Sequence, residues 1–103
     1  MNYGLIADEL SKINEVFSNF DEIEKVIVYG SRAKGNFKPS SDIDITFIGE
    51  KLDLSILNEV ALLLDDLMLP YTFDTSIFNQ ISSQDLIEHI TRVGKVLYEK
   101  VER

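Results

Sequence analysis

The chain has 103 residues, of which 45% are hydrophobic and 27% are charged, so it is long enough to build one compact core but not two. Ten basic side chains against 18 acidic ones give a formal net charge of −8, which argues against a nucleic-acid coat or an anionic membrane surface as partner. The absence of cysteine excludes disulfides and cysteine-based zinc sites, and a cytoplasmic location is therefore expected.

An amphipathic helix is the first predicted element. Its apolar residues are spaced four, three, four and three apart, as one face of a helix requires: Ile6, Leu10, Ile13, Phe17 and Phe20. Residues 1–10 include Asp8 and Glu9 and no long apolar run, so neither a signal peptide nor a membrane anchor is expected there. Residues 25–29 follow as a short β-branched and aromatic run that ends at Gly30, which predicts a buried strand.

A loop and a second strand come next. Residues 31–41 contain Gly35 and Pro39, which are typical of a turn and loop. Residues 42–48 then alternate in polarity, which predicts a strand with Asp42 and Asp44 on one face and apolar side chains on the other.

Another helix and another strand are predicted beyond a turn at residues 49–53. A second helical stripe runs from Leu54 to Met68 and stops before Pro70. Residues 71–77 alternate again, so a third strand is expected to carry Asp74 on its polar face.

A last helix is predicted after Ser82 or Ser83, either of which can cap it. Its apolar seam includes Leu97, with Gly94 as a stop or kink. The order helix, strand, strand, helix, strand, helix predicts a single domain over residues 1–103 of mixed α/β or α+β class, with a small sheet covered by helices.

Charge is distributed unevenly along these elements. Residues 31–41 hold Arg32, Lys34 and Lys38 and no acid, whereas residues 42–78 hold one basic and eight acidic side chains. Basic groups beside clustered carboxylates suit a site that holds a polyphosphate together with its divalent metal. The alternative interpretation is a solvated loop.

The acidic side chains also suggest a specific chemistry. Asp42 and Asp44 leave the same face of a strand roughly 6–7 Å apart at Cα, so they could share one magnesium ion or a close pair, with Asp74 as a third ligand. Burying all three without a cation would cost several kcal/mol. Before them, Gly30 and Ser31 stand where a small residue lets backbone N–H groups approach a phosphate.

Other polar side chains favour structural interpretations. The only histidine, His89, falls in the predicted last helix and is expected to be a partly exposed helix residue. Tyr29 is expected to pack at the end of its strand rather than to stack on a base. Asp65 and Asp66 are neighbours on a helix that do not share a face, so they are expected to be solvated.

Two of these segments together carry a family resemblance. The run Gly-Ser-Arg-Ala-Lys-Gly at residues 30–35, followed by Ser-Asp-Ile-Asp-Ile at residues 41–45, resembles the signature of the DNA polymerase β-type nucleotidyltransferase superfamily. The short chain and Asp74 are similar to the minimal nucleotidyltransferase (MNT) branch, and the resemblance extends from Val26 to Tyr98.

The resemblance implies a polymerase β-like nucleotidyltransferase fold and roles for individual residues. Gly30 and Ser31 would hold the triphosphate of ATP, and Asp42 and Asp44 would bind two magnesium ions. Asp74 would bind the catalytic ion and orient or deprotonate the attacking hydroxyl, which would displace pyrophosphate from the α-phosphorus. The loop residues Arg32 and Lys34 would neutralise phosphate charge, together with Lys38.

A partner protein is also implied. Minimal members of the family act as antitoxins of HEPN-domain toxins and transfer AMP to a toxin tyrosine, so a hetero-oligomer with such a toxin is expected. Two alternatives remain open at this point. The chain could neutralise a HEPN partner by binding alone, or it could transfer a nucleotide to a hydroxyl of a small molecule.

Overall fold

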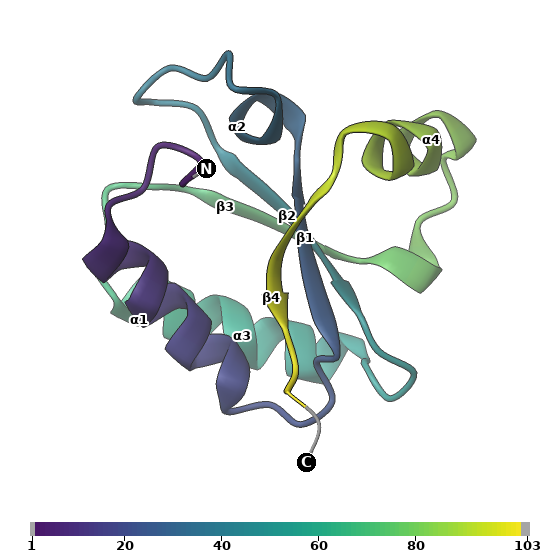
Figure 1. The fold of residues 1–103 in the computed structure, drawn as a ribbon. Helices are drawn as coiled ribbons and strands as arrows, with labels where there is room; N and C mark the ends of the chain where they lie inside the picture. The colour runs from purple at the N-terminus through teal and green to yellow at the C-terminus, as the bar shows by residue number, and fades with distance from the viewer. Residues whose placement is uncertain (1, 102–103) are drawn as a thin grey trace.

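Over residues 2–101, which the computed structural model describes, helices and strands alternate along the chain (Figure 1). Their order is α1 (Ala7–Ser18), β1 (Lys25–Tyr29), α2 (Gly30–Lys34), β2 (Ile43–Ile48), α3 (Leu54–Asp66), β3 (Phe73–Ile77), the 3-10 helix η1 (Phe78–Gln80), α4 (Gln84–Val93) and β4 (Lys95–Glu99). None of the helices within this range is long and apolar enough to cross a membrane.

The strands form one mixed sheet in the order β3-β2-β1-β4. β1 pairs antiparallel with β2 on one side and with β4 on the other. β2 and β3 are parallel, and α3 supplies the crossover that a parallel pair requires. The predicted mixed sheet covered by helices is therefore confirmed.

The hydrophobic core lies between the sheet and the pair α1 and α3, which lie side by side along one face (Figure 1). Alternate residues of the central strands point into it, namely Val26, Val28, Ile43, Ile45 and Phe47. Phe17 of α1 meets Phe47 and Tyr98 edge-on, with ring centroids 5.6 Å apart in both pairs. Because this face takes the apolar half of each strand, the polar half is turned to the opposite face.

The ends of the predicted helices follow from capping groups. The Asp53 carboxylate accepts a hydrogen bond from the Ile56 backbone N–H at 2.9 Å where α3 begins. Ser83, one of the two predicted caps, accepts from the Leu86 N–H at 3.3 Å where α4 begins. Such caps satisfy backbone donors that have no partner within the helix.

The predicted continuation of the last helix through Leu97 is wrong. α4 ends at Gly94, whose φ of −63° and ψ of 145° are extended, and Lys95–Glu99 becomes the edge strand β4. Leu97 is buried in the observed strand, and the predicted helix would also have placed it on the apolar side. The helical spacing of Leu97 therefore could not exclude a strand. The open edge of β1 decides the outcome, because it offers backbone hydrogen bonds to residues that favour strands, such as Val96 and Tyr98.

The loop predicted at residues 31–41 is shorter than expected. Its first part is the five-residue helix α2, which stops at Gly35 with a φ of 87°. Such a left-handed residue is a common end for a helix. α2 and α4 lie near each other over the polar face of the sheet, away from α1 and α3 (Figure 1).

Candidate active site

Two of the predicted acids are immediate neighbours on the polar face of the sheet. Asp44 of β2 pairs in register with Asp74 of β3. Registered residues of parallel strands point to the same side, so these carboxylates leave the sheet next to each other. Asp42 lies in the exposed chain just before β2, two residues from Asp44.

The charges of Asp42 and Asp74 both act on the carboxyl group of Asp44. Burial raises the pKa of Asp44 above its ordinary value, and the negative charges of Asp74 and Asp42 raise it further. His89 of α4 acts in the opposite direction and lowers that pKa. Since Asp44 lies beside two further carboxylates, the site gathers negative charge that a cation would offset.

The site as it stands is not a complete metal cage. Within residues 2–101, no group of three or more His, Cys, Asp or Glu side chains is arranged to hold a metal ion. The donor set nevertheless fits magnesium, because carboxylate oxygens are the ligands that this hard cation takes from proteins. Asp44 and Asp74 would be its first ligands, with Asp42 beside them.

Gly30 places the loop backbone directly against the acids. It has a φ of 73°, which side-chain-bearing residues rarely adopt. A Cβ at this position would collide with the Oδ2 atom of Asp44. The Gly-Ser turn and the acid pair therefore form one surface, with the half-buried Ser31 as the next residue.

We expect Gly30→Ala to lower both stability and nucleotide transfer. The left-handed backbone costs about 1–2 kcal/mol with a side chain present, and the added methyl would also displace Asp44. Gly35→Ala is a matched control, because Gly35 has a φ of 87° but no atom within 4 Å of the added Cβ. Urea unfolding should show similar losses for both variants, whereas only Gly30→Ala should reduce transfer in a labelled-ATP assay. Equal transfer by the two variants would contradict the proposed contact.

The sequence predicts that Arg32 lies in a basic loop and neutralises phosphate charge. In the structure its side chain is buried instead. Its side chain is only 1% exposed, and its guanidinium donates hydrogen bonds to the backbone carbonyls of Tyr3, Pro39 and Ser41 at 2.9–3.3 Å. The rings of Phe37 and Tyr71 each lie 5.0 Å from the guanidinium carbon.

This environment gives Arg32 a structural position. Its Nε and Nη2 atoms both donate to Ser41, the residue just before Asp42. The guanidinium therefore connects the Gly-Ser turn to the start of the acidic strand. Lys34 and Lys38 are exposed, as expected for a basic loop.

Sequence reasoning gave no functional role to four polar residues that lie beside the acids. Thr46 and Ser76 lie two residues beyond Asp44 and Asp74 on the same face, as strand alternation predicts. The ring of Tyr29 meets that of His89 edge-on at 6.1 Å. That contact could not be found from the sequence, because it depends on where α4 crosses the sheet.

Several solved structures share this fold. A toxin–antitoxin complex with AMP-PNP aligns with a TM-score of 0.70 at 23% sequence identity, covering 93% of this chain and 75% of that chain. The toxin–antitoxin complex MntA–HepT aligns with a TM-score of 0.66 at 21% identity, over 92% of this chain and 74% of that chain. A Shewanella oneidensis complex of a tri-AMPylated HEPN toxin with an MNT antitoxin aligns with a TM-score of 0.65 at 21% sequence identity. The alignment covers 89% of this chain and 71% of that chain.

A search of the curated proteins found no match to this sequence. A family model, by contrast, covers nearly the whole chain: the one described as polymerase beta, nucleotidyltransferase matches residues 11–103. The matched range includes the Gly-Ser turn and all three acids, in agreement with the resemblance that their spacing carries. The chain therefore belongs to the polymerase beta nucleotidyltransferase family.

Proposed function

We propose that this protein is a magnesium-dependent nucleotidyltransferase that moves AMP from ATP to a tyrosine hydroxyl of a HEPN toxin and thereby acts as its antitoxin. The observation that carries the proposal is the registered pair Asp44 and Asp74 against the Gly30 turn. Family membership supports the reaction class. Similarity to the complexes with AMP-PNP and with an AMPylated HEPN toxin supports the substrate and the partner.

In this proposal the Gly-Ser turn receives the triphosphate. Because Gly30 has no side chain, its backbone lies directly against Asp44 and its turn can approach a phosphate closely, and Ser31 can donate its hydroxyl to a phosphate oxygen. The exposed Lys34 and Lys38 lie in the loop that follows, where they can offset phosphate charge. Arg32 contributes by holding this loop rather than by touching the nucleotide.

Asp74 is proposed to act on the acceptor. The tyrosine oxygen attacks the α-phosphorus, its proton passes to the Asp74 carboxylate, and the bond to the leaving pyrophosphate breaks. Asp74 is exposed, so an incoming hydroxyl can reach it. Asp42, Asp44 and Asp74 would hold magnesium, which when bound neutralises phosphate charge and favours displacement at phosphorus.

The acceptor is proposed to come from another protein in a hetero-oligomer. Residues 1–103 are proposed to act as one minimal domain, in which the described helices and strands are used for the sheet and the layers on its two faces. The net charge of −8 suits a more basic partner surface. A cytoplasmic site of action fits the absence of cysteine.

The decisive experiment is the intact mass of the toxin after co-expression with this chain. We expect the HEPN toxin to gain one or more AMP units on tyrosine, and to gain none when it is expressed alone. A doubly substituted chain, Asp42→Asn with Asp44→Asn, is the matched control and should leave the toxin mass unchanged. If the wild-type chain suppresses toxicity without any mass increase, the chain acts by binding alone and the transfer proposal fails.

A further inference from the structure

Three hydroxyl side chains lie beside the acid pair on the same face of the sheet, on three neighbouring strands. Tyr29 of β1 is registered with Asp44, and Thr46 of β2 is registered with Ser76 of β3. Tyr29 is only 7% exposed and Thr46 is completely buried. Buried hydroxyls are costly unless they are hydrogen-bonded, so their partners matter.

Hydrogen bonds join these hydroxyls. Thr46 donates its one proton to the Ser76 backbone carbonyl at 3.3 Å. Ser76 must then be the donor in the 2.9 Å contact between the Ser76 and Thr46 hydroxyls. Ser76 also shares a hydrogen bond with the Tyr29 hydroxyl.

This chain of hydroxyls spans the sheet. β1 and β3 are not neighbours, because β2 lies between them. To reach Ser76, the Tyr29 side chain must therefore cross β2 beside Asp44. Burial raises the pKa of Tyr29 above its ordinary value, while the hydrogen bond with Ser76 acts in the opposite direction.

β3 needs such support more than β1 or β2. It is an edge strand whose ladder partner is β2, whereas β1 and β2 each pair on both sides. Asp74 therefore depends on one row of backbone hydrogen bonds for its register. The side-chain bonds from Ser76 to Thr46 fix the same register two residues further along.

We infer that Tyr29, Thr46 and Ser76 form a hydroxyl strap whose role is to hold Asp74 in register with Asp44. These are positioning residues that act through the two acids. The inference rests on the proposed function for its link to catalysis, but the strap itself is a property of the free chain. It can therefore be tested without toxin or nucleotide.

The test compares variants that each remove one hydroxyl: Tyr29→Phe, Thr46→Val and Ser76→Ala. Mn²⁺ serves as a paramagnetic substitute for magnesium, and its binding to the free chain is measured by electron paramagnetic resonance. Removing groups that orient metal ligands typically weakens metal binding about 10-fold or more. We also expect β3 amides to exchange with solvent about fivefold faster relative to β1 amides, which a global loss of stability would not produce.

Two variants serve as controls. Tyr98→Phe removes a tyrosine hydroxyl from the opposite face of the sheet, where the ring packs on Phe17, and should change neither readout. Thr46→Ser keeps the hydroxyl and should restore Mn²⁺ binding and β3 protection relative to Thr46→Val. Tyr29→Phe keeps the ring contact with His89, so it is the variant least disturbed in folding.

The outcomes separate this inference from the proposed function. Weaker Mn²⁺ binding with faster β3 exchange in the strap variants supports the strap, and a fall in kcat at unchanged KM for ATP would connect it to transfer. Wild-type Mn²⁺ affinity and wild-type β3 exchange in all three strap variants would overturn it. If the wild-type chain transfers no AMP, the proposed function fails, and β3 exchange still decides the strap.

Discussion

Asp44→Asn is expected to abolish AMP transfer while making the folded chain more stable. Loss of a group that only orients a metal ligand costs about 10–100-fold in activity, so loss of a proposed ligand should cost more than about 100-fold. Stability should change in the opposite direction, because burial and the negative charges of Asp74 and Asp42 both disfavour the ionised Asp44 carboxylate in the folded chain. Transfer is measured with ATP labelled at the α-phosphate, and stability by the midpoint of urea unfolding.

The stability gain should depend on pH in a defined direction. The pKa of Asp44 is raised in the folded state, so the folded chain binds its proton more tightly than the unfolded chain does. That contribution is present at low pH and is lost as the pH rises through the folded-state pKa. The advantage of Asp44→Asn over the wild type should therefore be smallest in acid and grow toward neutral pH.

A second aspartate controls for the loss of one negative charge. Asp66→Asn removes a charge from the exposed end of α3 and should leave transfer close to wild type. If Asp44→Asn transferred AMP at the wild-type rate, the proposed role of Asp44 as a magnesium ligand would be refuted. An Asp44→Asn chain less stable than the wild type at neutral pH would refute the repulsion among the acids.

Arg32→Lys is expected to destabilise the fold by about 3 kcal/mol, although it preserves the charge. The guanidinium satisfies carbonyls of Tyr3, Pro39 and Ser41 at once and stacks between two aromatic rings. An ammonium cannot reproduce the paired bonds to Ser41. Because domains of this size have about 5–15 kcal/mol of stability in total, the loss should be plain in urea or thermal unfolding.

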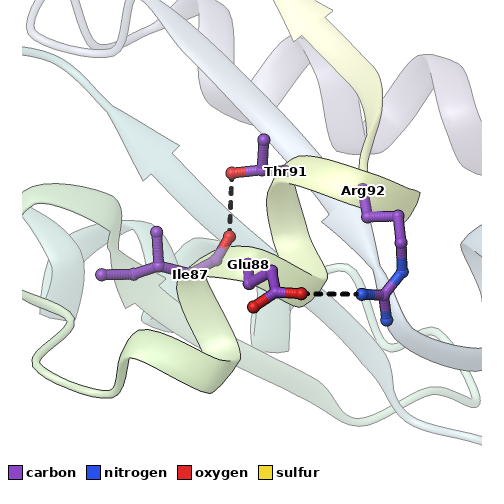
Figure 2. A network of polar contacts seen from close by, with 4 residues as sticks. All are labelled: Ile87, Glu88, Thr91 and Arg92. Atoms are coloured by element: carbon purple, nitrogen blue, oxygen red, sulfur yellow. Dashed lines mark hydrogen bonds and ion pairs between the residues drawn. The ribbon is translucent and has the colours of Figure 1, made fainter.

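The control is a charge-matched substitution at an exposed arginine. Arg92 of α4 donates to Glu88, one turn away, at 3.3 Å, while Thr91 donates to the Ile87 carbonyl (Figure 2). Both partners of the ion pair are exposed, so Arg92→Lys should cost no more than about 0.5 kcal/mol. If Arg32→Lys were equally mild, the guanidinium bonds would not support the loop as described.

Local patterns predicted most of the fold and the position of the acids. β1 has the predicted bounds, and β2 and β3 begin one and two residues later than predicted. Strand alternation placed Asp44 and Asp74 on polar faces, and the structure shows that these faces are the same face of one sheet. A two-residue period is a local property of an extended chain, which is why it survives folding unchanged.

The features that sequence could not predict all depend on distant contacts. Residues 95–99 form β4 because they pair with the free edge of β1. The sequence of residues 95–99 alone gives no information about that edge. The position of Arg32 depends on Tyr3 and Tyr71, which are far from it along the chain. The contact between His89 and Tyr29 depends on the path of α4. The functional roles of the acids, the Gly-Ser turn and the exposed lysines stay predictions.

The parallel pairing of β2 with β3 also has a consequence for biosynthesis. Asp44 and Asp74 meet only after the intervening helix has docked, and pairings between such distant segments form late in folding. A nascent chain carries the whole signature between residues 30 and 45 well before its third aspartate has left the ribosome. The pair of Asp44 and Asp74 can therefore form only after β3 has emerged from the ribosome, later than the Gly-Ser turn and the first two acids.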